Sequence, residues 1–156
     1  MNSDNMTRTR MELLHPIISE SIREGGQFVF YPSGISMLPT IKEREDCVVL
    51  VEVDDLQKND LILYRRKCGK YVLHRIIDIK NGEYTLCGDN QFRYEYGITS
   101  DMTIAMASEI RKKDGSVITL ADIRAYKPSS YLFIRRKLMC VRMFLGRIYR
   151  RIFKNK

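Results

Sequence analysis

The chain of 156 residues contains no tryptophan, only four prolines and only four cysteines. The cysteines are scattered, without a Cys-x-x-Cys pair, so we expect neither a zinc site nor a disulfide framework, and no other cofactor. No apolar run approaches the roughly 18 residues that span a bilayer, and residues 1–16 lack the apolar centre of a signal peptide. These absences favour one reduced, cytoplasmic domain with a substantial core.

Acidic residues are missing from one part of the chain only. From Tyr131 onward the sequence has nine Lys and Arg and no Asp or Glu. Residues 1–130 hold 18 basic and 19 acidic residues, so their net charge is about −1. The nine cations of the tail therefore account for the formal net charge of +8. A nearly neutral body makes nucleic acid an unlikely partner for it.

The hydrophobic pattern predicts a mainly β protein with helices at both ends. Residues 7–24 read as one helix, or two short ones around Pro16, that ends at Gly25-Gly26. β-Branched runs and turn signals then predict antiparallel strands at 27–31, 47–53, 60–79 (a hairpin), 83–87 and 102–110. We expect a helical segment over 1–26, a β domain over 27–127 and a helical tail over 128–156, with 88–101 rich in turns.

The stretch "YPSGISMLPTIKERED" (31–46) frames Ser36 with glycine and proline. A serine hydroxyl needs a base to become a nucleophile, and histidine, with an ordinary pKa near 6.5, suits that task. The chain has two histidines: His15, in the N-terminal helix, and His74, on the apolar face of a predicted strand. An ordinary turn serine and a satisfied core histidine are the alternatives that these residues leave open.

Three neighbours of Ser36 support a binding role for this turn. Gly34 allows the backbone to approach a bound peptide closely, and Pro39 prevents the turn from continuing as a helix. Met37 provides an apolar anchor that would hold the hydroxyl in place. Gly34, Met37 and Pro39 are therefore candidate substrate-binding residues beside Ser36.

The segment "SGISMLPT" (33–40) resembles the nucleophile box of the clan that contains signal peptidase I and the LexA-type repressors, Ser-Gly-x-Ser-Met-x-Pro-Thr. The segments "KNDLILYRR" (58–66), "YVLHRII" (71–77) and "GDNQ" (88–91) are similar to the later boxes of the clan, in the same order, with Asn59 in place of a glycine. Four ordered boxes are far more specific than one. The resemblance covers about residues 27–110 and implies a small antiparallel LexA- or signal-peptidase-like β domain.

The resemblance also assigns roles to residues. The run Leu73-His74-Arg75 is similar to the histidine branch, the endoplasmic-reticulum and archaeal type of signal peptidase, whereas other members have a lysine base. It implies Ser36 as nucleophile, His74 as general base and an acidic residue that orients it. Glu95 and Asp89 are both candidates for that acid. The Ser36 N–H would hold the oxyanion, and Gly34 replaces a hydroxyl that many relatives add there.

The implied function is a serine endopeptidase that removes a leader or signal-like segment through an acyl-enzyme. Its substrate would bind as an extended strand. One alternative is a self-cleaving LexA-type regulator, although about 25 residues before the first strand are few for a helix-turn-helix domain. The pair Cys68-Gly69 matches the dipeptide type that such regulators cut, but it lies between Ser36 and His74. A non-enzymatic scaffold that binds a membrane or nucleic acid is the other alternative.

The tail, residues 131–156, has the pattern of a basic amphipathic helix. Arg136, Arg147 and Arg150 lie mainly away from one apolar stripe, which is formed by Ile134, Leu138, Val141, Leu145, Ile148 and Ile152. Such a helix binds anionic bilayers, so we expect a peripheral protein on the inner membrane face. Packing on the domain, partner binding and a helical dimer seam are the alternatives, and the oligomeric state stays open.

Overall fold

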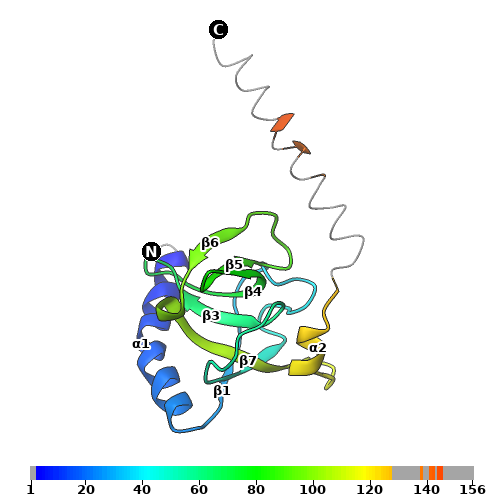
Figure 1. The fold of residues 1–156 in the computed structure, drawn as a ribbon. Helices are drawn as coiled ribbons and strands as arrows, with labels where there is room; N and C mark the ends of the chain where they lie inside the picture. Colours follow the sequence, from blue (N-terminus) through cyan, green and yellow to red (C-terminus); the bar gives the residue numbers. More distant parts are fainter. Residues whose placement is uncertain (1–2, 128–137, 139–140, 143, 146–156) are drawn as a thin grey trace.

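The computed structural model describes residues 3–127, 138, 141, 142, 144 and 145. Eight strands form one open antiparallel sheet in the order β1-β2-β7-β3-β4-β5-β6, with β8 paired to β7 (Figure 1). The strands are β1 (Phe28–Phe30), β2 (Cys47–Val51), β3 (Leu61–Arg65), β4 (Tyr71–Lys80), β5 (Glu83–Cys87), β6 (Glu95–Ile98), β7 (Thr103–Arg111) and β8 (Val117–Thr119). The prediction of a mainly β, antiparallel protein is confirmed.

The N-terminal helix α1 (Ser3–Arg23) is continuous through Pro16, so the one-helix prediction is the correct one. It ends where the glycines predict. Gly25 has a φ of 74°, a left-handed conformation that glycine adopts without strain. The Gly25 N–H donates to Ile22 O (2.9 Å) and the Gly26 N–H to Ser21 O (3.1 Å), the hydrogen bonds of a Schellman cap.

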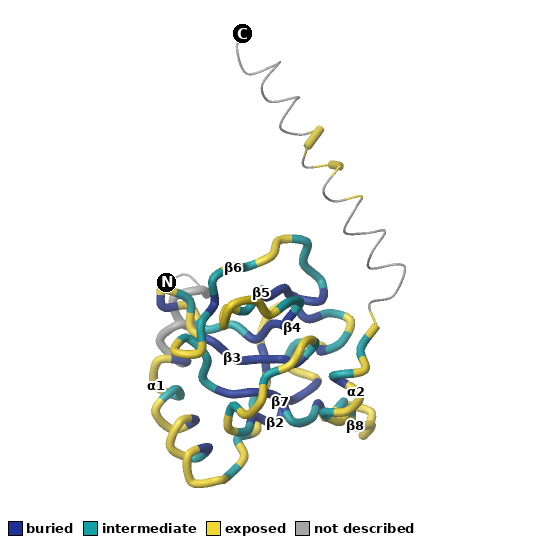
Figure 2. Tube along the Cα trace, in the orientation of Figure 1, coloured by how far each residue is buried: buried dark blue, intermediate teal, exposed yellow. Residues whose placement is uncertain are grey.

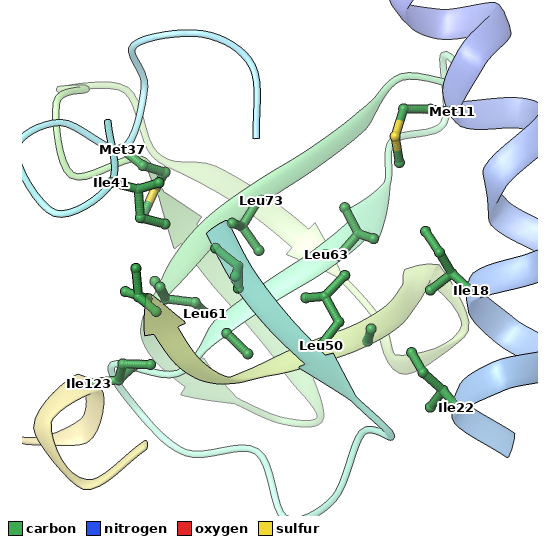
Figure 3. Close-up of a cluster of buried hydrophobic side chains, with 14 residues drawn as sticks. Met11, Ile18, Ile22, Met37, Ile41, Leu50, Leu61, Leu63, Leu73 and Ile123 are labelled. Atoms are coloured by element: carbon green, nitrogen blue, oxygen red, sulfur yellow. The ribbon is translucent and has the colours of Figure 1, made fainter. Parts of the chain in front are cut away.

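The helix α1 packs on one face of the sheet and shares its core. In Figure 3, Ile18 and Ile22 point from α1 toward Leu50 and Leu63 of the central strands. Successive side chains of β3 alternate between the two faces, because a strand has a period of two residues. Leu61 and Leu63 join this core, while Ile62 and Tyr64 join a smaller cluster with Ile76, Leu86, Ile98 and Met106. Strands β2 and β3 are buried along most of their length, and Figure 2 shows further buried residues in β4 and β7.

The predicted hairpins are confirmed. β3 and β4 pair antiparallel, with Ile62 opposite His74. β4 and β5 are joined by Asn81 and Gly82, both at positive φ, as the Asn-Gly signal predicts. The elements that were not predicted include β6, inside the segment expected to be turns only, and the short helix α2 (Leu120–Arg124).

The helix α2 begins directly after β8, so this strand ends at Thr119. Thr119 accepts a hydrogen bond from the Asp122 N–H, and the Asp122 carboxylate accepts one from the Thr119 N–H. This reciprocal capping box starts a helix at that point. A one-turn 3-10 helix, η1 (Ser100–Met102), connects β6 to β7.

Five residues of the C-terminal tail are described, and all five are helical. Leu138, Val141, Phe144 and Leu145 are each more than half exposed. Of the other predicted tail residues, Ile134, Arg136, Arg147, Ile148, Arg150 and Ile152 lie outside the described part of the chain. Within the described part, no helix combines the length and the apolar character needed to cross a bilayer.

Candidate active site

Ser36 lies in the turn that follows β1, and its residue is half-buried. The next residue, Met37, is buried in the core that α1 shares with the sheet, and its packing there holds the turn on the domain. Gly34 has a φ of 94°, which explains why a glycine stands there. Pro39 is exposed in the same turn and follows a cis peptide bond.

Residues just after β5 hold the Ser36 turn. The Asn90 N–H donates to Ser36 O (2.8 Å), and the Asn90 side-chain Nδ2 donates to Ile35 O (2.9 Å). Between the two segments lies Gly88, where an added Cβ would be 2.7 Å from Ser36 O and 3.0 Å from His74 Nε2. Ser36 O and His74 Nε2 are therefore no farther apart than the sum of these two distances. The structure brings the predicted serine and histidine together against one glycine.

His74 contacts Glu95, one of the two candidate carboxylates. The imidazole is only 1% exposed, and its Nδ1 lies 2.9 Å from Glu95 Oε1. The Tyr64 hydroxyl lies 3.5 Å from the same Nδ1. A ring whose Nδ1–H donates to a carboxylate keeps Nε2 as an acceptor in its neutral form. Nε2 is the nitrogen on the Gly88 and Ser36 side.

Arg66 also holds Glu95. Its Nε and Nη2 donate to the two carboxylate oxygens, each at 2.6 Å. Burial alone would raise the pKa of Glu95, but hydrogen bonds from His74, Arg66 and Tyr64 outweigh it and lower the pKa to about 2. Glu95 is consequently an anion at neutral pH. Burial raises the pKa of Tyr64, and the negative charge of Glu95 raises it further, so the Tyr64 hydroxyl remains protonated.

Asp89, the other candidate carboxylate, joins Arg75 to the Ser36 turn. It is buried and accepts hydrogen bonds from Arg75 Nε (2.8 Å) and Nη2 (2.7 Å). Thr40, at the end of the nucleophile-like box, donates its hydroxyl to the same carboxylate. Arg75 follows His74 in β4, so this ion pair ties the strand of the histidine to the turn of the serine.

Arg75 also connects this strand to α2. It donates to Asn59 O (2.8 Å) and Ile123 O (3.3 Å), and its guanidinium carbon lies 3.8 Å from the Tyr126 ring centroid. Asn59 has a φ of 80°, a conformation that asparagine tolerates better than most residues, which accounts for asparagine where the resembling boxes have glycine.

A cavity of about 760 Å³ opens beside Ser36 and His74. Its walls come from α1, from consecutive residues 28–37 and from consecutive residues 70–74, and it also reaches Arg66. Gly34, Ser36 and Met37, three of the candidate binding residues, line it. Pro39 is the predicted binding residue that is not among the described residues lining the cavity. A cavity of this size leaves room for a peptide backbone.

Two strand edges border this cavity. β1 is the first strand of the sheet and pairs with β2 on one side only. β4 pairs with β3 over Tyr71–Arg75, but its recorded pairing with β5 begins only at Arg75. Four antiparallel steps separate β1 from β4 in the strand order, so the two strands run in the same direction. Both run toward the end where Ser36 and His74 lie.

Comparisons of the chain with protein-family models, curated proteins and solved structures found no match. In the described part of the chain, no group of three or more His, Cys, Asp and Glu could hold a metal ion.

Sequence reasoning did not single out four residues of this site: Tyr64, Arg66, Gly88 and Asn90. Gly88 and Asn90 belong to "GDNQ", a box noted for its resemblance, but close approach of the backbone to Ser36 and His74 needs three dimensions to detect. Arg66 became relevant only because the unpredicted strand β6 carries Glu95 to it.

Gly88→Ala tests the close packing of this site. The added methyl meets the Ser36 carbonyl, a backbone atom that cannot rotate away, so we expect a destabilisation of about 1–3 kcal/mol in urea unfolding. The imidazole NMR signals of His74 should shift as well. Gln91→Ala, which only removes a neighbouring side chain, is the control and should leave those signals near their original positions. Unchanged stability and unchanged signals in Gly88→Ala would contradict the geometry.

Glu95→Gln tests the charge on Glu95. A carboxyl whose folded pKa is about 2, below the ordinary 4.5, stabilises the fold at pH values above 4.5, and this contribution is lost as pH falls toward 2. The free energy of unfolding of the wild type should exceed that of Glu95→Gln at neutral pH. The difference should shrink between pH 4.5 and 2, as measured by urea unfolding at each pH. A constant difference across this window would show that the carboxylate is not held as an anion.

Proposed function

We propose that the protein is a serine endopeptidase with a LexA- or signal-peptidase-like β fold. Ser36 is the nucleophile, His74 the general base and Glu95 the residue that orients the base. The proposal is carried by one observation: Glu95 contacts His74 Nδ1, and His74 Nε2 faces the Ser36 turn across Gly88. A cavity between two strand edges lies at the same place.

The proposed reaction follows from this order of contacts. The Nδ1–H of His74 donates to Glu95, so Nε2 takes the Ser36 hydroxyl proton as Oγ attacks a peptide carbonyl carbon. The imidazolium then gives this proton to the leaving amine, and an acyl ester remains on Ser36. Water, deprotonated by His74, hydrolyses the ester and frees the enzyme. The anionic Glu95 stabilises the charged imidazole in both steps.

The tetrahedral oxyanion is assigned to the backbone N–H of Ser36. Gly34 brings no hydroxyl to this position. Because one oxyanion donor is worth roughly 3 kcal/mol, its lack affects the rate but not the type of reaction.

The substrate is proposed to bind as an extra strand between β1 and the first half of β4. Backbone groups along residues 28–32 and 70–74 border the cavity and run toward the reacting pair. Strand addition of this kind uses main-chain hydrogen bonds for affinity and side-chain pockets for specificity. A leader or signal-like segment, which is extended and accessible, is the substrate class that suits this geometry.

The second part of the proposal concerns the tail, which we propose binds an anionic membrane surface. Leu138, Val141, Phe144 and Leu145 are helical and exposed, with the cation Arg142 among them. Apolar side chains can enter the acyl boundary while cations bind headgroups. The peptidase would then act as a peripheral enzyme at the inner membrane face.

A fluorophosphonate probe tests the nucleophile. Intact-mass and peptide mass spectrometry should locate a single covalent adduct on Ser36, because His74 Nε2 faces the Ser36 turn across Gly88. His74→Ala should slow labelling by roughly 10²–10⁴-fold, the usual contribution of a general base. Glu95→Gln should also slow it, by loss of the orienting contact.

The matched control for labelling is Ser33→Ala, which removes another serine of the same turn and should keep the adduct. An adduct that persists in Ser36→Ala, or that forms equally fast in His74→Ala, would exclude the proposed mechanism.

Vesicle co-sedimentation of the full chain tests the tail. Binding to phosphatidylglycerol vesicles should exceed binding to phosphatidylcholine vesicles and should weaken with salt. The double variant Leu138→Glu with Leu145→Glu should bind about tenfold less or weaker still, since two apolar side chains leave the bilayer. Leu13→Glu, which changes an exposed leucine of α1, should bind like the wild type. Equal sedimentation of the wild type and the double variant with phosphatidylglycerol vesicles would contradict membrane binding by the apolar residues of the tail.

A further inference from the structure

The cavity beside Ser36 and His74 extends to the helix α1. Met11 and Leu14, two apolar residues of this helix, line it. The helix precedes residues 27–110, the segment that resembles the peptidase boxes, so the resemblance assigns no role to it. A volume of about 760 Å³ lies in the range of roughly 300–1,000 Å³ that is typical of ligand sites. The cavity therefore has room for side chains of a bound peptide as well as for its backbone.

One face of α1 carries the side chains that meet the cavity and the core. Met11, Leu14 and Ile18 are spaced by three and four residues, so they share a face of the helix. Met11 and Ile18 are buried in the core cluster (Figure 3), and Leu14 packs against it. Leu13, in contrast, is 70% exposed. Two adjacent leucines of one helix thus differ in environment, because Leu14 borders the cavity and Leu13 faces solvent.

A contact between α1 and β4 shows where along this strand the helix lies. The Tyr71 hydroxyl lies 3.1 Å from His15 Nδ1, and the two rings meet edge to face with their centroids 5.4 Å apart. Tyr71 begins β4 and precedes His74 by three residues, and a strand rises about 3.3 Å per residue. The helix therefore meets β4 roughly 10 Å along the strand from the general base.

The two faces of β4 differ, so a peptide that continues the sheet beside this strand also has two different sides. Tyr71 and Leu73 belong to the core that α1 covers, whereas Val72 packs against the smaller cluster on the other face. Phe28 and Phe30 of β1 pack against the same core as Tyr71, and they line the cavity too. Side chains of a docked strand alternate between faces. Every second residue of such a peptide consequently points toward α1 and these apolar side chains.

We propose that the enzyme prefers peptides with a large apolar residue, such as Leu, Met or Phe, about three positions from the cleaved bond. The side chain of this residue occupies the cavity between α1 and β4, beside Leu14 and Tyr71, where removal of its apolar surface from water is favourable. This inference rests on the peptidase function proposed above and names its substrate class. The apolar residue lies before the cleaved bond if the peptide runs parallel to β4, and after it if the peptide runs antiparallel.

Cleavage-site profiling with the full wild-type chain tests this preference. The substrate is a synthetic mixture of peptides in which every residue type occurs at every position, and mass spectrometry identifies the bonds that are cut. About three positions from the cut, Leu, Met and Phe should be enriched over Ala by roughly tenfold or more, the discrimination that an apolar pocket provides. The side of the cut on which they are enriched reports the direction of the bound peptide.

Substitutions of Leu14 should shift the preferred size of that residue in opposite directions. Leu14→Ala enlarges the cavity and should favour Phe, whereas Leu14→Phe narrows it and should favour Ala and Val. A loss of folding cannot produce opposite shifts, and urea unfolding checks that each variant is folded. Leu13→Ala and Leu13→Phe are the matched controls, because they make the same changes on the neighbouring exposed leucine. Both should keep the wild-type preference.

Cut sites without an apolar preference, or equal effects of the substitutions at Leu13 and Leu14, would overturn the inference. If the wild type cuts none of the peptides, fluorescence anisotropy with the full-length Ser36→Ala protein decides. Tighter binding of a labelled Leu-containing peptide than of its Ala counterpart, changed by Leu14→Phe but not by Leu13→Phe, supports the apolar site. Equal binding of the two peptides overturns it.

Fluorophosphonate labelling of Ser36 in the wild type separates this inference from the proposed function. Labelling without an apolar preference leaves the peptidase function standing and removes the inference. An apolar preference in binding without labelling supports the peptide site and overturns the chemistry.

Discussion

The contact between Glu95 and His74 is the interaction on which the rest of the site depends. An imidazole removed from solvent has no water to define its tautomer, so a protein group must do so. Glu95 does this as an anion, because hydrogen bonds from His74, Arg66 and Tyr64 lower its pKa against the effect of burial. Three strands, β3, β4 and β6, must therefore keep their positions relative to one another for one nitrogen of His74 to face Ser36.

His74 and Arg75 show how one strand serves two purposes. Neighbouring side chains of a strand point to opposite faces. His74 contacts the Glu95 carboxylate, and Arg75 pairs with the Asp89 carboxylate. Asp89 and Arg75 form a buried pair that is joined to the Ser36 turn through Thr40. Removing one partner of a buried pair leaves an uncompensated charge, so such pairs fix positions firmly even where their net contribution to stability is small.

Much of this arrangement could be predicted from sequence. β-Branched runs and the Asn81-Gly82 turn located the strands, and the scarcity of histidine restricted the search for a base to His74. The strand β6 was missed because its four residues follow a polar, turn-like segment and do not show a clear alternation. The choice between Glu95 and Asp89 could not be made earlier, because it depends on the register that places Glu95 opposite Leu86. The role of Gly88 depends on two loops meeting, which has no local signal.

The Tyr126 ring under Arg75 has a mechanical consequence. Arg75 also donates to Ile123 O, so α2 and Tyr126, two residues beyond its end, are held by the neighbour of His74. The Asn59 side chain donates to the carbonyls of Arg124 and Tyr126, and Arg124 pairs with Asp60, so the segment just before β3 holds the same residues. A pull on the chain at Lys127 would therefore load β4, which carries His74, and the start of its partner strand β3 together.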